Sequence, residues 1–73
     1  MKKCYILSSS VTYANKGVKQ LRQNGITGRV ERSPKGIFDE GCGYCVTVKC
    51  EELQTALDVF ENTGVPVKSV YEP

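Results

Sequence analysis

Apolar residues recur along this chain with two different periods, and the two periods predict different elements. Two stretches carry apolar residues at three- and four-residue spacing, which is the pattern of an amphipathic helix. The first predicts a helix over residues 11–23, with an apolar stripe of Val11, Ala14, Val18 and Leu21. The second predicts a helix over residues 51–62, with a stripe of Leu53, Ala56, Leu57 and Phe60. Each stripe indicates a helix that lies on another layer of the protein.

Four runs rich in β-branched and aromatic residues predict strands. These runs are residues 3–7, 29–33, 43–49 and 65–71. Between the second and third runs, a proline and several glycines predict a loop over residues 34–41.

Signals for helix ends agree with these boundaries. Ser8-Ser9-Ser10 offers hydroxyl groups that can cap the first backbone N–H groups of the helix over residues 11–23. Asn24-Gly25 and Thr63-Gly64 follow the two helices and favour left-handed caps. Gly17 lies inside the first helix, where it weakens the helix modestly.

The predicted order is strand, helix, strand, strand, helix, strand. With right-handed crossovers this order predicts an α+β protein with the ferredoxin-like βαββαβ sandwich. Its sheet has four antiparallel strands, and both helices cover one face. The first and third strands are central neighbours that run in opposite directions, so the start of the third strand lies beside the end of the first.

The length of 73 residues predicts a single domain over residues 1–73. The apolar run after Met1-Lys2-Lys3 lasts only from Cys4 to Leu7, and no segment approaches the roughly 18 apolar residues of a membrane span. We therefore expect no signal peptide, no membrane contact and a cytoplasmic location. In a reducing compartment the four cysteines indicate metal, redox or nucleophilic use rather than disulfides.

The net charge of +2 conceals an uneven distribution along the chain. Residues 1–37 carry eight Lys or Arg against Glu31 alone, whereas residues 38–73 carry seven acids against Lys49 and Lys68. The split predicts a basic face and an acidic face. These faces are either solvated surfaces or, on the basic side, a docking surface for an acidic partner or an anion. The candidate docking residues are Lys16, Lys19, Arg22, Arg29, Arg32 and Lys35.

Gly41-Cys42-Gly43 is the most informative motif, because it leads directly into the third predicted strand. A cysteine between two glycines has little side-chain cover. The predicted topology places Cys42 beside Ser9, Ser10 and the positive N-terminus of the first helix, which would stabilise a thiolate. The alternative is that Cys42 is a small apolar filler. The glycines argue against packing, and we interpret Cys42 as a reactive thiol.

Cys45 forms a Cys-x-x-Cys pattern with Cys42. In an extended strand the two residues would be about 10 Å apart and on opposite faces, beyond the ~7 Å between Cα atoms that a disulfide allows. A turn over residues 41–44 would permit closure. Cys45 is therefore either a core residue or a second thiol.

Several function classes lack the residues they need. Without histidine the chain has no Cys-His or Ser-His pair, so we do not expect an enzyme. We also expect no cofactor, and the predicted strands lack the paired aromatic residues of an RNA-recognition sheet. Cys4 and Cys50 are predicted to lie away from Cys42, which argues against a four-cysteine metal site. A soft-metal site formed by Cys42 and Cys45 stays an alternative.

The sequence also resembles a known family, the selenium/sulfur carrier-like proteins, which are small domains long described as of unknown function. Gly41-Cys42-Gly43 matches the most characteristic triplet of the family. Shorter similarities cover most of the chain: Tyr5-Ile6-Leu7 with Ser10 and Ala14, Gly25-Ile26, Pro34-Lys35, Gly64-Val65 and Val70-Tyr71. The chain departs from the family pattern at Tyr44-Cys45, where a second thiol could release a cargo or resolve it in a redox reaction.

The resemblance implies a carrier in which Cys42 holds sulfur or selenium as a persulfide-type adduct. Gly41 and Gly43 would give access to the thiol, Ser9 and Ser10 would stabilise the adduct, and Lys35 would contact an anion. The implied partners are a cysteine desulfurase or another sulfur or selenium donor, and an acceptor protein. A different class of function stays open, a non-catalytic module that binds a protein through its sheet and basic helix.

Overall fold

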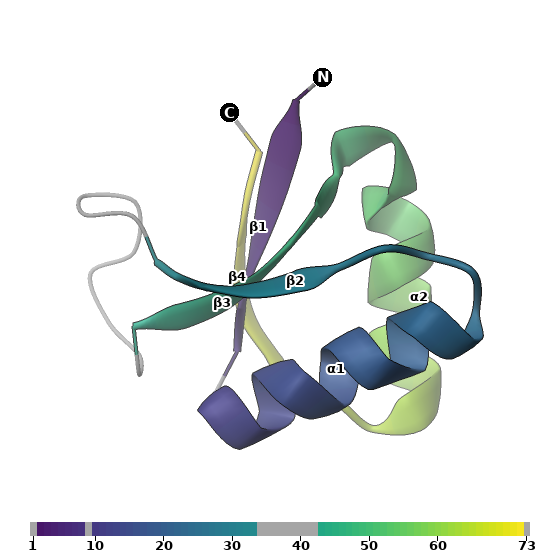
Figure 1. Cartoon of the computed structure of the whole chain (residues 1–73), viewed down its shortest axis with the longest axis horizontal. Coiled ribbons are helices and arrows are strands. Elements are labelled where there is room, and N and C mark those ends of the chain that lie inside the picture. The colour runs from purple at the N-terminus through teal and green to yellow at the C-terminus, as the bar shows by residue number, and fades with distance from the viewer. Residues whose placement is uncertain (1, 9, 34–42, 73) are drawn as a thin grey trace.

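The structure is a computed structural model that describes residues 2–8, 10–33 and 43–72 (Figure 1). The described elements follow one another as β1 Lys3–Ser8, α1 Val11–Gln23, β2 Arg29–Arg32, β3 Tyr44–Lys49, the 3-10 helix η1 Cys50–Glu52, α2 Leu53–Thr63 and β4 Val67–Tyr71. The predicted order of elements is confirmed. The helix predicted over residues 51–62 differs in detail, because its first two residues, Glu51 and Glu52, belong to η1 and the α-helix begins at Leu53.

The four strands form one antiparallel sheet in the order β2-β3-β1-β4. The central strands β1 and β3 pair from Lys3 opposite Lys49 to Leu7 opposite Cys45. Both helices lie on the same side of this sheet (Figure 1). The arrangement is the predicted ferredoxin-like fold, and the start of β3 lies beside the end of β1 as expected.

Local signals explain where the helices begin and end. The Ser10 side chain caps α1, and its Oγ accepts a hydrogen bond from the Tyr13 backbone N–H at 3.2 Å. Helix α2 ends at Gly64, which has a φ of 74°. The Val65 N–H then donates to the Phe60 carbonyl at 2.9 Å, as in a left-handed C-terminal cap.

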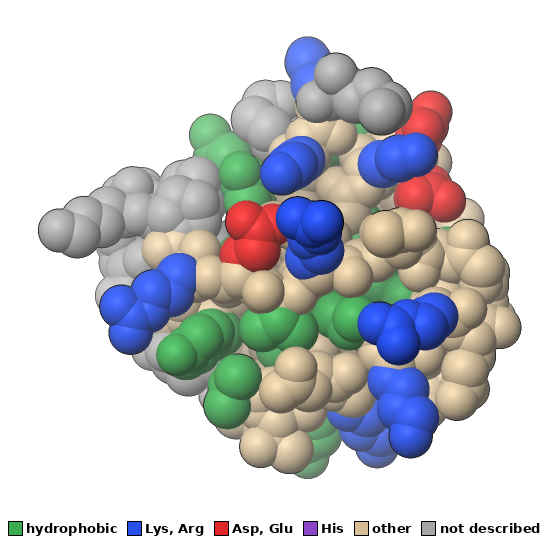
Figure 2. All heavy atoms as spheres, in the orientation of Figure 1, with side chains coloured by type: hydrophobic (Ala, Val, Ile, Leu, Met, Phe, Trp, Pro, Cys, Tyr) green, Lys and Arg blue, Asp and Glu red, His purple; other side chains and the backbone are tan. Residues whose placement is uncertain are grey.

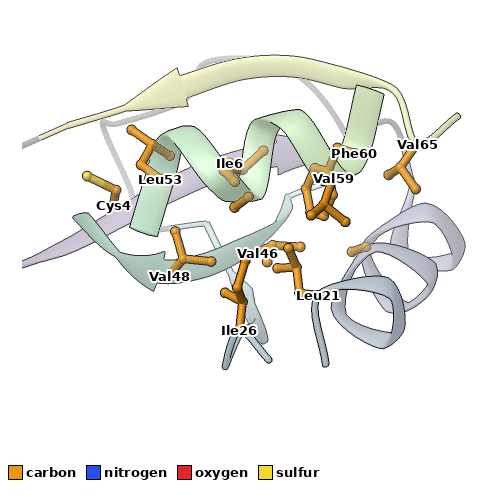
Figure 3. Packing of buried hydrophobic residues seen from close by; sticks show 12 residues of the cluster. Cys4, Ile6, Leu21, Ile26, Val46, Val48, Leu53, Val59, Phe60 and Val65 are labelled. Atoms are coloured by element: carbon orange, nitrogen blue, oxygen red, sulfur yellow. The ribbon is translucent and has the colours of Figure 1, made fainter. Parts of the chain in front are cut away.

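A continuous apolar core fills the space between the sheet and the helices (Figure 3). The sheet contributes the side chains at alternate positions of β1 and β3, and α2 contributes Leu53, Ala56, Val59 and Phe60. The predicted stripe of α2 is largely correct, although Leu57 is only partly buried and Val59 is buried instead. Val11 was expected in the stripe of α1, but it is 41% exposed because the first turn extends past the core.

Gly17 has a packing role that helix propensity does not reveal. A Cβ atom at this position would lie 2.8 Å from Cζ of Phe60, so the bare backbone of α1 accommodates the aromatic ring of α2. The expectation that Gly17 only weakens its helix is therefore incomplete. Its absent side chain allows the two helices to approach closely. In the described ranges, neither helix is long and apolar enough to cross a membrane.

Candidate functional site

The end of the β2–β3 hairpin is the part of the candidate site that the structure describes. The Ser33 N–H donates a hydrogen bond to the Gly43 carbonyl at 2.7 Å and closes the hairpin just beyond β2 and β3. Gly43 has a φ of 82°, a conformation that favours glycine. A Cβ atom at Gly43 would have no heavy atom within 4 Å among the atoms considered around it. Gly43 is thus a turn residue, and the residue before it in the sequence is Cys42.

Four of the predicted site residues, Ser9, Lys35, Gly41 and Cys42, lie outside the described residues. The structure places the other three, Ser10, Gly43 and Cys45, at one end of the sheet. The pairing of Leu7 with Cys45 puts the start of β3 beside the end of β1, and α1 begins three residues after that end. The strand register therefore places Gly43 and the N-terminus of α1 at the same end of the sheet, whereas the predicted position of Cys42 beside that terminus lies outside the described residues.

Ser10 has a defined structural role at this end of the sheet. Its hydroxyl oxygen accepts a hydrogen bond from the Tyr13 N–H, and its carbonyl accepts another from Ala14 at 3.0 Å. The side chain therefore completes the first turn of α1. This contact explains why a serine is suited to the position without a role in binding a cargo.

Cys45 is fully buried, with an exposed fraction of 0%. Its neighbours along β3, Val46 and Val48, belong to the core between sheet and helices. Because successive side chains of a strand alternate between faces, the side chain of Cys45 lies on the other face of the sheet. There its cross-strand neighbours are Leu7, which is also fully buried, and Glu31. Cys45 is therefore an interior residue, and its role as a second thiol stays a prediction.

The structure contains a disulfide between Cys4 and Cys50, whose Cα atoms are 5.0 Å apart. The expectation that the cysteines serve other chemistry than disulfides is wrong for these two residues. The Cys-x-x-Cys pair that the sequence singled out includes Cys42, which lies outside the described residues. Cys4 is buried at the start of β1, and Cys50 is the first residue of η1, directly after β3.

The signal that would have found this disulfide is the strand topology itself. The argument that brings the start of β3 beside the end of β1 also brings the end of β3 beside the start of β1. The backbone confirms this proximity, because the Cys50 N–H donates to the Lys2 carbonyl at 3.2 Å. The disulfide thus lies at the end of the sheet opposite Gly43, and the expected separation of Cys4 and Cys50 from the glycine-flanked motif agrees with this placement.

The part of the chain that the structure describes contains no cluster of side chains suited to bind a metal ion. No group of three or more Cys, Asp or Glu side chains there could hold an ion.

The residues predicted to form a basic docking surface are divided between two elements. Lys16, Lys19 and Arg22 are exposed on α1, whereas Arg29 and Arg32 are exposed on β2. The Arg32 guanidinium lies over the Tyr44 ring at 5.8 Å from its centroid, beside the hairpin end.

Comparison with known proteins adds one match. The family described as "Putative Se/S carrier protein-like" matches residues 3–72 of this chain. Neither the comparison with curated proteins nor the comparison with solved structures gave a match. The family match runs through β1, both helices and β4, and it includes the Gly-Cys-Gly motif before β3. This chain therefore belongs to the family of selenium/sulfur carrier-like proteins.

Proposed function

We propose that this protein is a carrier of sulfur or selenium that uses the thiol of Cys42. The observation that carries the proposal is the position of the other three cysteines. Cys4 and Cys50 are joined to each other, and Cys45 is fully buried. Among the described cysteines, the disulfide and burial therefore remove all three from reaction, and Cys42, which lies outside the described residues, is the thiol that we propose as the carrier.

The described surroundings of the motif suit a reactive thiol. Gly43 adds no side chain that could shield its neighbour, and its positive φ turns the chain as it enters β3. The N-terminus of α1 lies at the same end of the sheet, and its partial positive charge would favour a thiolate or perthiolate there. A lower thiol pKa would raise the fraction of nucleophile at neutral pH.

The proposed step is a transfer between thiols with no net oxidation. The Cys42 thiolate attacks the outer sulfur of a persulfide on a donor protein, such as a cysteine desulfurase. A new S–S bond forms at Cys42 while the S–S bond of the donor breaks, and the donor cysteine leaves as a thiolate. An acceptor protein would take the outer sulfur in the same way. Because each transfer leaves the carrier unchanged after the cycle, the protein needs no turnover of its own and no cofactor.

The alternatives have less support from the described structure. A soft-metal site formed by Cys42 and Cys45 would need a buried side chain to become a ligand. A non-catalytic interaction module would not require Cys42 at all. The variant Cys42→Ser therefore separates the two functions, because it should keep the binding of such a module but lose the loading of a carrier.

The test is loading by a donor. The protein is incubated with a cysteine desulfurase and cysteine, and its intact mass is measured without reductant. Wild type should gain the mass of one sulfur atom, Cys42→Ser should gain none, and Cys45→Ala should load like wild type. Equal loading of wild type and Cys42→Ser would refute the assignment of the carrier thiol. Absence of loading in all three proteins, with donors of both sulfur and selenium, would refute the carrier function.

A further inference from the structure

The face of the sheet opposite the helices carries side chains in regular rows. Residues that pair across the four strands place Arg29, Thr47, Tyr5 and Tyr71 side by side in one row. The next row toward the disulfide contains the direct partners Lys3 and Lys49. The row on the other side contains Cys45 and Leu7, which are fully buried, together with their partners Glu31 and Ser69, which are partly exposed. Lys3, Arg29 and Lys49 of this face therefore gather in the half of the sheet near the disulfide.

Three cations from three neighbouring strands meet in this half of the face. Lys3 of β1 and Lys49 of β3 are exposed and directly opposite each other, so their Cα atoms are about 5 Å apart. Arg29 of β2 belongs to the adjacent row, one strand further and roughly 7 Å along the sheet. Figure 2 shows Lys and Arg side chains gathered over β2 and toward the N-terminal end of the chain. Like charges directly opposite in a sheet lower its stability.

The four described strands themselves provide little compensating negative charge. Glu31 is the only acidic residue in the four described strands, against five Lys or Arg. Its carboxylate accepts a hydrogen bond from the Thr47 hydroxyl at 2.5 Å, and because that hydroxyl is neutral the carboxylate still offsets one of the three cations. Three cations near one carboxylate leave a net positive potential on this half of the face.

A hollow of about 160 Å³ lies between these cations. Its lining includes Lys3, Arg29 and Lys49, together with Thr27, Thr47 and Val48. The hollow is open to solvent and has room for a small ion, which the flexible lysine and arginine side chains can reach. Like charges on paired residues oppose strand pairing, and such local conflicts are expected at functional sites. A bound anion would offset the repulsion between these side chains.

We propose that Lys3, Arg29 and Lys49 form a binding site for a small oxyanion of the phosphate or sulfate class. A bound dianion would neutralise the opposed lysines and accept charge-assisted hydrogen bonds from all three side chains. The site lies at the end of the sheet opposite Gly43, so it is separate from the proposed carrier motif and does not depend on it.

The first test measures thermal unfolding at constant ionic strength, with chloride replaced stepwise by inorganic phosphate or sulfate. Wild type should show a rise in Tm that follows the occupancy of one site, reaching about 6–11 °C at a concentration near ten times Kd. Lys49→Gln should lose this rise, and without phosphate its Tm should equal or exceed that of wild type because the lysine repulsion is gone. The matched control is Lys19→Gln, which removes an exposed charge from α1 and should keep the full response.

The outcomes separate specific binding from general salt effects. Exclusion of phosphate or sulfate from protein surfaces raises Tm equally in all variants, and this result would overturn the proposal. A second measurement follows the backbone amide signals of Lys3, Thr47 and Lys49 by NMR, which should shift and saturate with phosphate. A short polyglutamate peptide that shifts these signals at a lower concentration than phosphate would overturn the assignment of a small oxyanion in favour of an acidic protein partner.

Discussion

The ring of Phe60 lies against the backbone of Gly17, where an added Cβ would come within 2.8 Å of Cζ and 2.9 Å of Cε1. Gly17→Ala should therefore destabilise the protein, although alanine is the better helix former by about 1 kcal/mol. Overpacking of a core contact costs about 1–3 kcal/mol, so we expect a net loss of about 1 kcal/mol in the free energy of unfolding by urea. Asn15→Ala, at an exposed position of the same helix, is the control and should be neutral or stabilising.

The same contact can be tested from its other partner. In a Phe60→Leu background the ring is absent, and Gly17→Ala should then cost less than it does in wild type. An equal cost in both backgrounds would show that the effect of the alanine does not come from the ring of Phe60.

Reduction of the Cys4–Cys50 disulfide should lower stability substantially. The two residues are 46 positions apart, and closing a loop of this length restricts the unfolded chain by an amount equivalent to about 4 kcal/mol. We expect a loss of about 2–4 kcal/mol in urea unfolding when dithiothreitol is added. Cys50→Ser is the matched control, because its stability should not respond to the reductant. Unchanged stability of a fully reduced wild-type protein would contradict a stabilising role.

Alkylation should separate the four cysteines by their accessibility. Native protein treated with iodoacetamide without reductant should gain one adduct, at Cys42, because Cys45 is buried and the other two cysteines are joined. Unfolding without reductant should expose Cys45 and add a second adduct. Unfolding with reductant should bring the total to the four cysteines of the chain. Peptide mapping that places the native adduct on Cys45 would contradict its burial.

Ser10→Ala tests whether the serine before α1 stabilises the helix or the thiol. Loss of the hydrogen bond to the Tyr13 N–H should cost about 1 kcal/mol of stability. Loading of Cys42 by a donor should be unchanged, since the Ser10 side chain serves the helix cap. The exposed Thr12→Ala is a control with a similar loss of a hydroxyl but no cap. A variant with normal stability and impaired loading would instead assign Ser10 to the cargo.

Much of the fold could be predicted because its signals are local and repetitive. The apolar spacing of Leu53, Ala56 and Phe60 defines the buried side of α2 without knowledge of its partners. The order of elements then restricts the sheet to few topologies. The expectation for Val11 was wrong because periodicity continues into the first turn of α1, while the core beneath it ends earlier.

Contacts between distant residues were harder to predict. Nothing in the sequence around Gly17 indicates that an aromatic ring from another helix lies on it. The Cys4–Cys50 disulfide depends on the strand register, and the cluster of Lys3, Arg29 and Lys49 depends on three strands at once. Cys42 lies outside the described residues, so its role as the carrier thiol stays a prediction from the sequence.

The covalent link between the first strand and the end of β3 has a consequence for damage to the chain. A single cleavage by a protease anywhere between positions 4 and 50 would produce two fragments that stay attached through sulfur. The nicked molecule would migrate at its original mass until a reductant released the pieces. After such a cleavage the protein would consist of two fragments that the disulfide keeps together.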